Sequence, residues 1–219
     1  MKVLALFIMS VTLAGAVATL VISTPVAFSA QKEPRFPQLK VEDLNEQQRP
    51  VADEILKVSS IGISGPYNPL LRSPVMADRM LKLLDYLRFN TTVPRKLNEF
   101  AILIQGRLWT SQIEWVAHYP LAIKAGLSES VANDLKEGRR PANMQPDEAV
   151  VYDLCLEAAT KHAVSDATFK RAREIFSEQQ VVDLLMVSGT YASVAMLANA
   201  AEEPAPGGKT PLQPLPADH

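Results

Sequence analysis

The sequence predicts an all-α fold, organised as a single compact multi-helix domain. Apolar residues recur at helical spacing over most of the chain, helix-capping residues stand at regular intervals, and no segment shows the period-2 alternation of a strand. The chain has 219 residues, 47% of them apolar, which is enough for one sizeable core. We therefore expect about seven or eight helices in one domain.

Residues 1–30 have the features of a signal peptide. Lys2 is followed by a run without charges at 3–22, and small residues then lead to Ala30. This order is typical of a secretory signal, with cleavage after Ser29 or Ala30. The alternative is an uncleaved anchor in the membrane, since about 20 apolar residues can span a bilayer. In both cases we expect an exported protein, periplasmic or secreted.

The expected helical domain covers residues 31–203. Its helices are predicted from N-caps, prolines in first turns and closing glycines, and a loop is expected at 62–69. The last 16 residues, 204–219, contain five prolines and two glycines, so we expect an extended or disordered tail. The predicted helices are 46–60 (with a true start nearer Pro50), 73–89, 94–108, 112–126, 128–138, 146–163, one capped by Ser165, and 177–201.

Charge and cysteine content exclude several classes of function. Lys and Arg number 22 against 24 Asp and Glu, so no basic excess favours a nucleic-acid partner. The single cysteine, Cys155, excludes an internal disulfide and a Cys-x-x-Cys pair, and its apolar helical face indicates an inert core thiol. There are only three histidines, and one of them is the last residue. We expect no metal and no other cofactor.

Residues 94–126 contain the side chains best suited to catalysis. On one unbroken helix, four polar residues would be spaced four, three and four apart and would share a face: Arg107, Ser111, Glu114 and His118. Histidine exchanges a proton near neutral pH, and a carboxylate one turn away can meet it. This spacing indicates a Glu–His proton-transfer site, with an arginine available for an anionic substrate.

A second arrangement follows if this helix breaks near Ser111. Glu99 lies off the polar face of an unbroken helix, but a break would let its segment fold across and meet His118. The residues Ser111 to Glu114 form a capping box, which favours the break and also gives both residues a purely structural alternative. Packing or surface ion pairing is the alternative for other members of the stretch: Trp109, Trp115 and Arg107.

A series of short motifs covers about residues 39–203. The most specific is Glu-Trp-x-x-His at 114–118, with Glu99 upstream. The others are Pro-Tyr-Asn-Pro-Leu-Leu-Arg-Ser-Pro at 66–74, Arg-x-Trp at 107–109, Ala-Gly-Leu at 125–127, Glu-x-x-Val-Tyr-Asp at 148–153 and Val-Ser-Asp-x-x-Phe at 164–169. In this order they resemble the carboxymuconolactone decarboxylase family of the alkylhydroperoxidase D-like (AhpD-like) superfamily. The resemblance implies an all-α fold assembled as a homotrimer or homohexamer.

The resemblance also implies roles in a decarboxylation. Loss of CO₂ from a lactone acid leaves a dienolate that must be protonated. His118 would deliver the proton, and Glu99 or Glu114 would orient its ring. Arg107 would bind a carboxylate or the developing enolate. The implied lining of the substrate pocket is Tyr67, Asn68, Trp115 and Ser111.

The peroxidase branch of the superfamily carries a Cys-x-x-Cys pair before its histidine, and Ser111 and Glu114 occupy those positions here. A thiol peroxidase needs a thiolate, so we expect an exported decarboxylase-like enzyme that acts on a small organic acid or lactone. A non-catalytic small-molecule binder, or a peroxiredoxin-like activity without the cysteine pair, is the alternative. The family's pathway is cytoplasmic, so the export signal leaves the particular substrate unassigned. Residues 100–104, apolar on every face, predict burial within the chain or against a second copy.

Overall fold

The computed structural model describes residues 33–59 and 61–215, so the predicted signal peptide and its cleavage site lie outside the described part. The described residues are helical and contain no strand, which confirms the all-α prediction. The α-helices are α1 (Arg49–Val58), α2 (Tyr67–Leu70), α3 (Pro74–Asp85), α4 (Arg95–Leu108), α5 (Gln112–Lys124), α6 (Glu129–Lys136), α7 (Pro146–Thr160), α8 (Asp166–Ile175) and α9 (Glu178–Ala200). Three further turns are η1 (Val41–Asp43), the π turn η2 (Tyr86–Asn90) and η3 (Pro206–Gly208).

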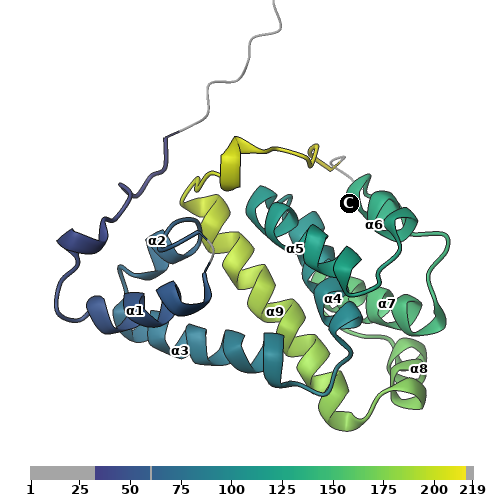
Figure 1. Ribbon diagram of the computed structural model, residues 1–219. Helices are drawn as coiled ribbons and strands as arrows, with labels where there is room; N and C mark the ends of the chain where they lie inside the picture. The colour runs from purple at the N-terminus through teal and green to yellow at the C-terminus, as the bar shows by residue number, and fades with distance from the viewer. Residues whose placement is uncertain (1–32, 60, 216–219) are drawn as a thin grey trace, which may run out of the picture. The chain divides into compact units, whose positions relative to one another are not determined.

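Helix α4 is the centre of the domain (Figure 1). It packs against α5, α7 and α9, and every residue from Leu97 to Arg107 is buried. The run Phe100–Ile104 is therefore enclosed on all faces by its own chain. Contacts within one chain are enough to bury these apolar side chains. A second copy of the chain is not needed for this, so the run does not by itself indicate an oligomer.

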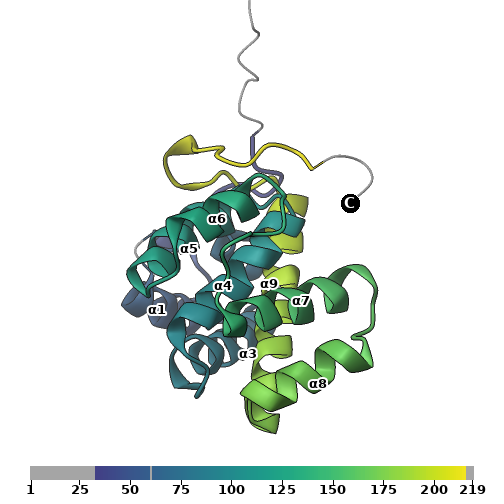
Figure 2. The same cartoon turned by 90° about the vertical axis from the view of Figure 1, so that its right-hand side faces the viewer.

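Two hydrophobic clusters form most of the core. The larger joins α4, α5, α7 and α9 through residues such as Phe100, Leu154 and Leu184. The smaller gathers residues of α1, the α2 turn and α3, and reaches α9 through the half-buried Leu197. Figure 1 shows α1, α2 and α3 on one side of α9 and α4 and α5 on the other, while Figure 2 shows α7 and α8 as a hairpin of helices.

Within the described residues, α9 is long and apolar enough to cross a membrane by length and composition alone. In the domain it is a core helix, which packs on α4, α7, α5 and α8. Residues from Val181 to Ala198 on several of its faces are buried. Burial in a protein core explains the same apolar composition.

Most helix ends follow the predicted signals. Ser73 occupies the N-cap position of α3 without making a capping hydrogen bond, so Pro74 in the first turn is the signal that remains. Gly126 and Gly138 follow α5 and α6 with φ of 101° and 74°, the left-handed conformation expected of a helix-ending glycine. Three predicted caps accept a backbone N–H of the first turn: Ser128, Ser165 and Ser177.

Helix α1 begins at Arg49, with Pro50 in its first turn, which confirms the predicted start near Pro50. Two other boundaries differ from the prediction. The expected loop at 62–69 runs into the short helix α2, which begins at Tyr67. The helix expected at 73–89 ends as α3 at Asp85 and continues as the π turn η2. A π turn adds one residue to a helical turn, and apolar spacing does not reveal it.

Beyond the η3 turn the C-terminal tail is extended, and it is docked on the domain as far as it is described. Leu212 is buried in the larger cluster. Its backbone N–H and C=O both pair with the side-chain amide of Gln112, at 2.9 and 2.8 Å. Leu215 packs against Gly138. Leu212 and Leu215 anchor this segment on the domain.

Candidate active site

The chain breaks between α4 and α5. Thr110 takes a left-handed φ of 47°, and the Ser111 hydroxyl accepts the Glu114 N–H at 3.5 Å as the N-cap of α5. The sequence left open either one unbroken helix or two helices separated by a break near Ser111, and the structure has the break. Because α4 and α5 pack side by side, Glu99 of α4 reaches His118 of α5.

His118 lies between two buried carboxyl groups. Its Nδ1 is 2.7 Å from Glu99 Oε2, and its Nε2 is 3.6 Å from Glu114 Oε2. All three residues are at most 5% exposed. A carboxylate oxygen only accepts, so a charged Glu99 takes the hydrogen of Nδ1–H in this short contact and leaves Nε2 as the ring nitrogen that can exchange a proton.

Glu114 has the environment of a carboxyl group that retains its proton. Burial raises its pKa above the usual value, against the opposing charges of His118 and Arg88, and the neighbouring Glu99 raises it further. A buried carboxyl with a raised pKa holds its proton closer to neutral pH. Glu114 can therefore store a proton beside Nε2 of His118.

The position of Glu114 depends on a glycine in the facing helix. A Cβ at Gly106 would lie 3.2 Å from the Cβ of Glu114 and 3.7 Å from the backbone nitrogen of Trp115. The missing side chain lets α5 approach α4 closely at this level. Gly106 is thus a positioning residue for the carboxyl group that faces His118.

A pocket of about 460 Å³ opens onto this cluster, between the α1–α3 segment and helices α5 and α9. His118 and Glu114 form part of its wall, together with Tyr191 from α9, Tyr67 from α2 and Arg88 from η2. The ring of Tyr191 meets that of His118 edge-on, with centroids 5.0 Å apart. Much of the remaining wall is apolar: Leu70, Met80, Leu84, Val194 and Leu197.

The two tyrosines of the pocket remain protonated at neutral pH. Burial raises the pKa of Tyr191 well above its usual value and raises that of Tyr67 as well. The charge of Arg88 acts in the opposite direction on both pKa values. Each phenol can therefore donate a hydrogen bond to a ligand.

Four of the predicted site residues come together here: His118, Glu99, Glu114 and Tyr67. Arg107 does not, because the break at Thr110 ends the polar face on which it was expected. It lies in a separate hollow with Gly138 and Tyr152, and its guanidinium donates to Thr110 Oγ1 at 3.2 Å. The expected contact between Arg107 and the substrate is therefore not supported.

The other three predicted residues hold the fold together. Asn68 is fully buried and donates to Glu203 Oε1 at 2.6 Å and to the Phe36 carbonyl at 3.2 Å. Trp115 is a core residue, its ring 6.0 Å from that of Tyr119. Ser111 caps α5, the structural alternative that its capping box offered.

Arg88 and Tyr191 were not identified from the sequence. Arg88 lies on a π turn that the spacing predicted as an ordinary helix end. Tyr191 lies in the middle of an apolar helix, and a tyrosine hydroxyl in such a segment is a signal that a polar partner is needed. That signal could have identified it.

Cys155 lies apart from this cluster, on α7. Its side chain is fully buried in the larger hydrophobic cluster, and burial raises the pKa of the thiol to about 12. It is the single cysteine of the chain. Among the residues that the structure describes, no His, Cys, Asp or Glu side chains are grouped as a metal site.

No model of a known protein family matches the chain, and no curated protein matches it. Solved structures do. An uncharacterised peroxidase-related protein with an AhpD core from Ralstonia eutropha aligns with a TM-score of 0.69 and 16% identity, over 84% of this chain and 97% of its own. A peroxidase-related protein from Silicibacter gives 0.66 and 13%, over 84% and 98%.

A third solved structure, from Agrobacterium tumefaciens, is described as a protein of unknown function and putative antioxidant defence protein AhpD. It aligns with a TM-score of 0.57 and 17% identity, over 65% of this chain and 99% of its own. At these identities the likeness defines the fold. The chain has the all-α, AhpD-like fold that its motifs predicted.

Proposed function

We propose that the protein is an enzyme of the carboxymuconolactone decarboxylase type, which couples decarboxylation of a small organic acid or lactone to proton transfer. The observation that supports this most is the buried Glu99–His118–Glu114 cluster at the wall of a pocket. A histidine fixed at one ring nitrogen and facing a pocket with the other is the arrangement that general acid–base catalysis requires.

The proposed reaction balances with the residues of this cluster. The C–C bond to the carboxylate breaks, CO₂ leaves, and the electron pair remains on the substrate as an enolate. Glu114, whose pKa is raised, passes its proton to Nε2 of the neutral His118 ring, and Nε2–H delivers that proton to carbon. Glu99 stabilises the transiently charged ring through Nδ1–H, and water then returns a proton to Glu114, so one proton is taken up from solvent for each CO₂ released.

A thiol peroxidase reaction is the less favoured function, although two of the similar structures are called peroxidase-related. Such a reaction needs an accessible thiolate. Cys155 is 0% exposed, and burial raises its pKa to about 12. Ser111 and Glu114 stand where that branch of the superfamily carries its cysteines.

The proposal is tested by incubating the purified protein with carboxylated lactones and β-keto acids in D₂O. CO₂ release and deuterium in the product are followed together. His118→Ala should lower turnover by about 10²–10⁴-fold, the usual contribution of a general acid. His162→Asn is the matched control, because His162 is exposed and has a left-handed φ of 56° that asparagine tolerates.

Cys155→Ser should keep most of the activity, because its hydroxyl can pair with Ser188 as the thiol does. If Cys155→Ser abolishes turnover while His118→Ala is tolerated, the chemistry depends on sulfur and the proposal is wrong. Ligand binding without CO₂ release from any acid of the panel would instead favour the non-catalytic binder.

Export and self-assembly complete the proposal. N-terminal sequencing of the exported protein should start at Ala30 or Gln31, whereas Met1 on membrane-bound material would favour the anchor. Light scattering at micromolar concentration should give the mass of a homotrimer or homohexamer. A monomer mass would contradict the assembly that the family resemblance implies.

A further inference from the structure

We propose that Arg88 is the residue that recognises a carboxylate in this pocket, and that the pocket takes a small carboxylic acid with an apolar body. This inference rests on the proposed function for the location of the site. It concerns what the site binds, so it can be tested without turnover.

Arg88 is a cation that, among the described residues, makes no hydrogen bond or ion pair. Its Nε is buried without a hydrogen-bond partner. By contrast, Arg79 and Arg171 each pair with an aspartate. A guanidinium has five donors, and donors that lose water without gaining an acceptor are costly. A ligand acceptor at Arg88 would relieve that cost.

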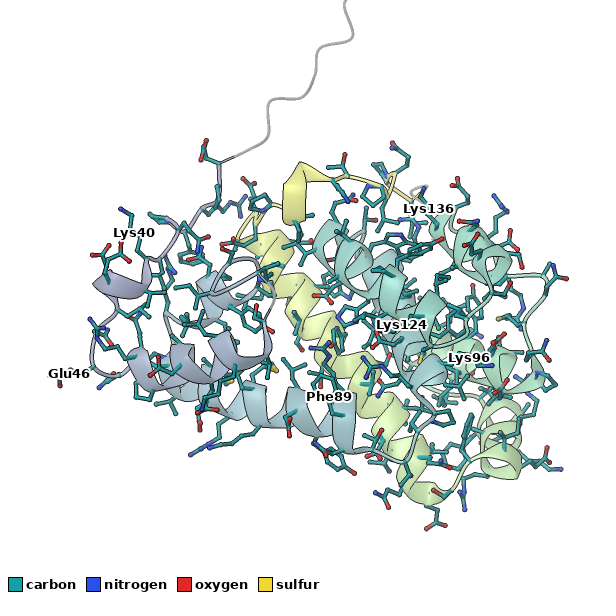
Figure 3. The ribbon with its side chains drawn as sticks, viewed as in Figure 1. Lys40, Glu46, Phe89, Lys96, Lys124 and Lys136 are labelled. Atoms are coloured by element: carbon teal, nitrogen blue, oxygen red, sulfur yellow. The ribbon has the colours of Figure 1, made fainter. Side chains whose placement is uncertain are left out.

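The backbone holds Arg88 in this place. On the π turn η2, Leu87 is 1% exposed and belongs to the larger core cluster, while the next residue, Arg88, lines the pocket. The side-chain amide of Asn98 donates to the Leu87 carbonyl and ties the turn to α4. The guanidinium lies over the ring of Phe89, 4.8 Å from its centroid; Figure 3 marks Phe89 at the end of the α3–η2 segment.

The remainder of the pocket indicates the kind of ligand. Tyr67 is a protonated phenol in the wall of the same pocket as Arg88, and the charge of Arg88 lowers the pKa of Tyr67. The two side chains can therefore bind one carboxylate together. A guanidinium binds a carboxylate through two parallel hydrogen bonds. The apolar part of the ligand then contacts the apolar wall: Leu70, Met80, Leu84 and Leu197.

A structural role for Arg88 as the counter-ion of Glu114 is the alternative. Their charges interact, since Arg88 lowers the pKa of Glu114, but no ion pair joins them. If Arg88 acted only through Glu114, its removal would have no effect on ligand preference once Glu114 is made permanently neutral. If Arg88 itself binds the carboxylate, its removal should abolish the preference for a carboxylate ligand equally, whether residue 114 is the wild-type Glu114 or a neutral glutamine.

The test is calorimetric binding of benzoate and of benzamide, which has nearly the same shape without the charge. The wild-type protein should prefer benzoate by at least about tenfold, as expected for charge-assisted hydrogen bonds. Arg88→Met should abolish the preference, in the wild-type and in the Glu114→Gln background, and Arg88→Lys should keep part of it. Arg79→Met is the matched control, since Arg79 lies on α3 with 69% of its side chain exposed.

Three results would overturn the inference: no preference in the wild-type protein, a preference that survives Arg88→Met, or an equal loss in Arg79→Met. If Arg88→Met does not fold, Arg88→Gln replaces it with the same expectation. His118→Ala separates the two proposals. If His118→Ala keeps both turnover and the preference for benzoate, the proposed function is contradicted. Arg88 then remains the carboxylate-binding residue.

Discussion

Replacing Gly106 with alanine tests how closely α4 and α5 must pack to bring Glu114 beside His118. The new Cβ would stand 3.2 Å from the Cβ of Glu114, closer than the ordinary carbon–carbon contact of about 3.5–4.0 Å. Alanine gains about 1 kcal/mol over glycine within a helix, while overpacking a filled interior costs about 1–3 kcal/mol. The free energy of unfolding should therefore fall by about 0–2 kcal/mol.

Gly189 of α9 provides the matched control, because a Cβ there meets nothing within 4 Å. Gly189→Ala should raise the free energy of unfolding by about 1 kcal/mol. Urea titrations followed by circular dichroism measure both variants, and Gly106→Ala should lie about 1–3 kcal/mol below Gly189→Ala. Equal stabilisation by the two alanines would refute the tight packing inferred at Gly106.

Two further substitutions and one labelling experiment test individual residues. Asn68→Ala should lower the free energy of unfolding by about 1–3 kcal/mol by leaving buried partners unpaired, with KM unchanged; a higher KM at unchanged stability would restore its predicted substrate contact. Burial raises the pKa of Glu114 above 4.5, so its neutral form stabilises the fold below that pH and this stability is lost as pH rises. In urea titrations, Glu114→Gln should match the wild-type protein near about pH 4 and exceed it near about pH 8, and the opposite trend would contradict the assignment. Cys155, with a pKa raised to about 12 by burial, should react with a disulfide reagent at the rate of unfolding, and fast reaction in the native protein would contradict its burial.

The fold was predictable because its signals are local. Helix starts and ends are set by residues within one helical turn of the boundary. These residues are the serine caps, the prolines in first turns, and the closing Gly126 and Gly138. The contact between Glu99 and His118 was predictable only as one of two alternatives, because it depends on whether the helix breaks. The capping box at Ser111 favoured the break, and the left-handed Thr110 completes it.

The rest of the site depends on packing that no local pattern encodes. Arg107 was expected at the site because its spacing from His118 suits a single helix, and the break removes that relation. Arg88 reaches the pocket through a π turn that the spacing of α3 does not reveal. A polar Asn68 in a proline-containing loop has the sequence pattern of a ligand-binding residue. Its hydrogen-bond partners, Phe36 and Glu203, come from distant parts of the chain and give it a structural role.

The protonation state of the His118 ring is the most direct test of the central claim, which is that Glu99 fixes Nδ1 and leaves Nε2 to exchange a proton. Long-range ¹H–¹⁵N spectra of the three histidines, with the His118→Gln variant used for assignment, report which ring nitrogen carries the proton. At a pH at which the ring is neutral, the wild-type protein should show the His118 proton on Nδ1, and Glu99→Gln should shift the population toward the Nε2–H form. A wild-type ring protonated at Nε2, unchanged by Glu99→Gln, would contradict the claim.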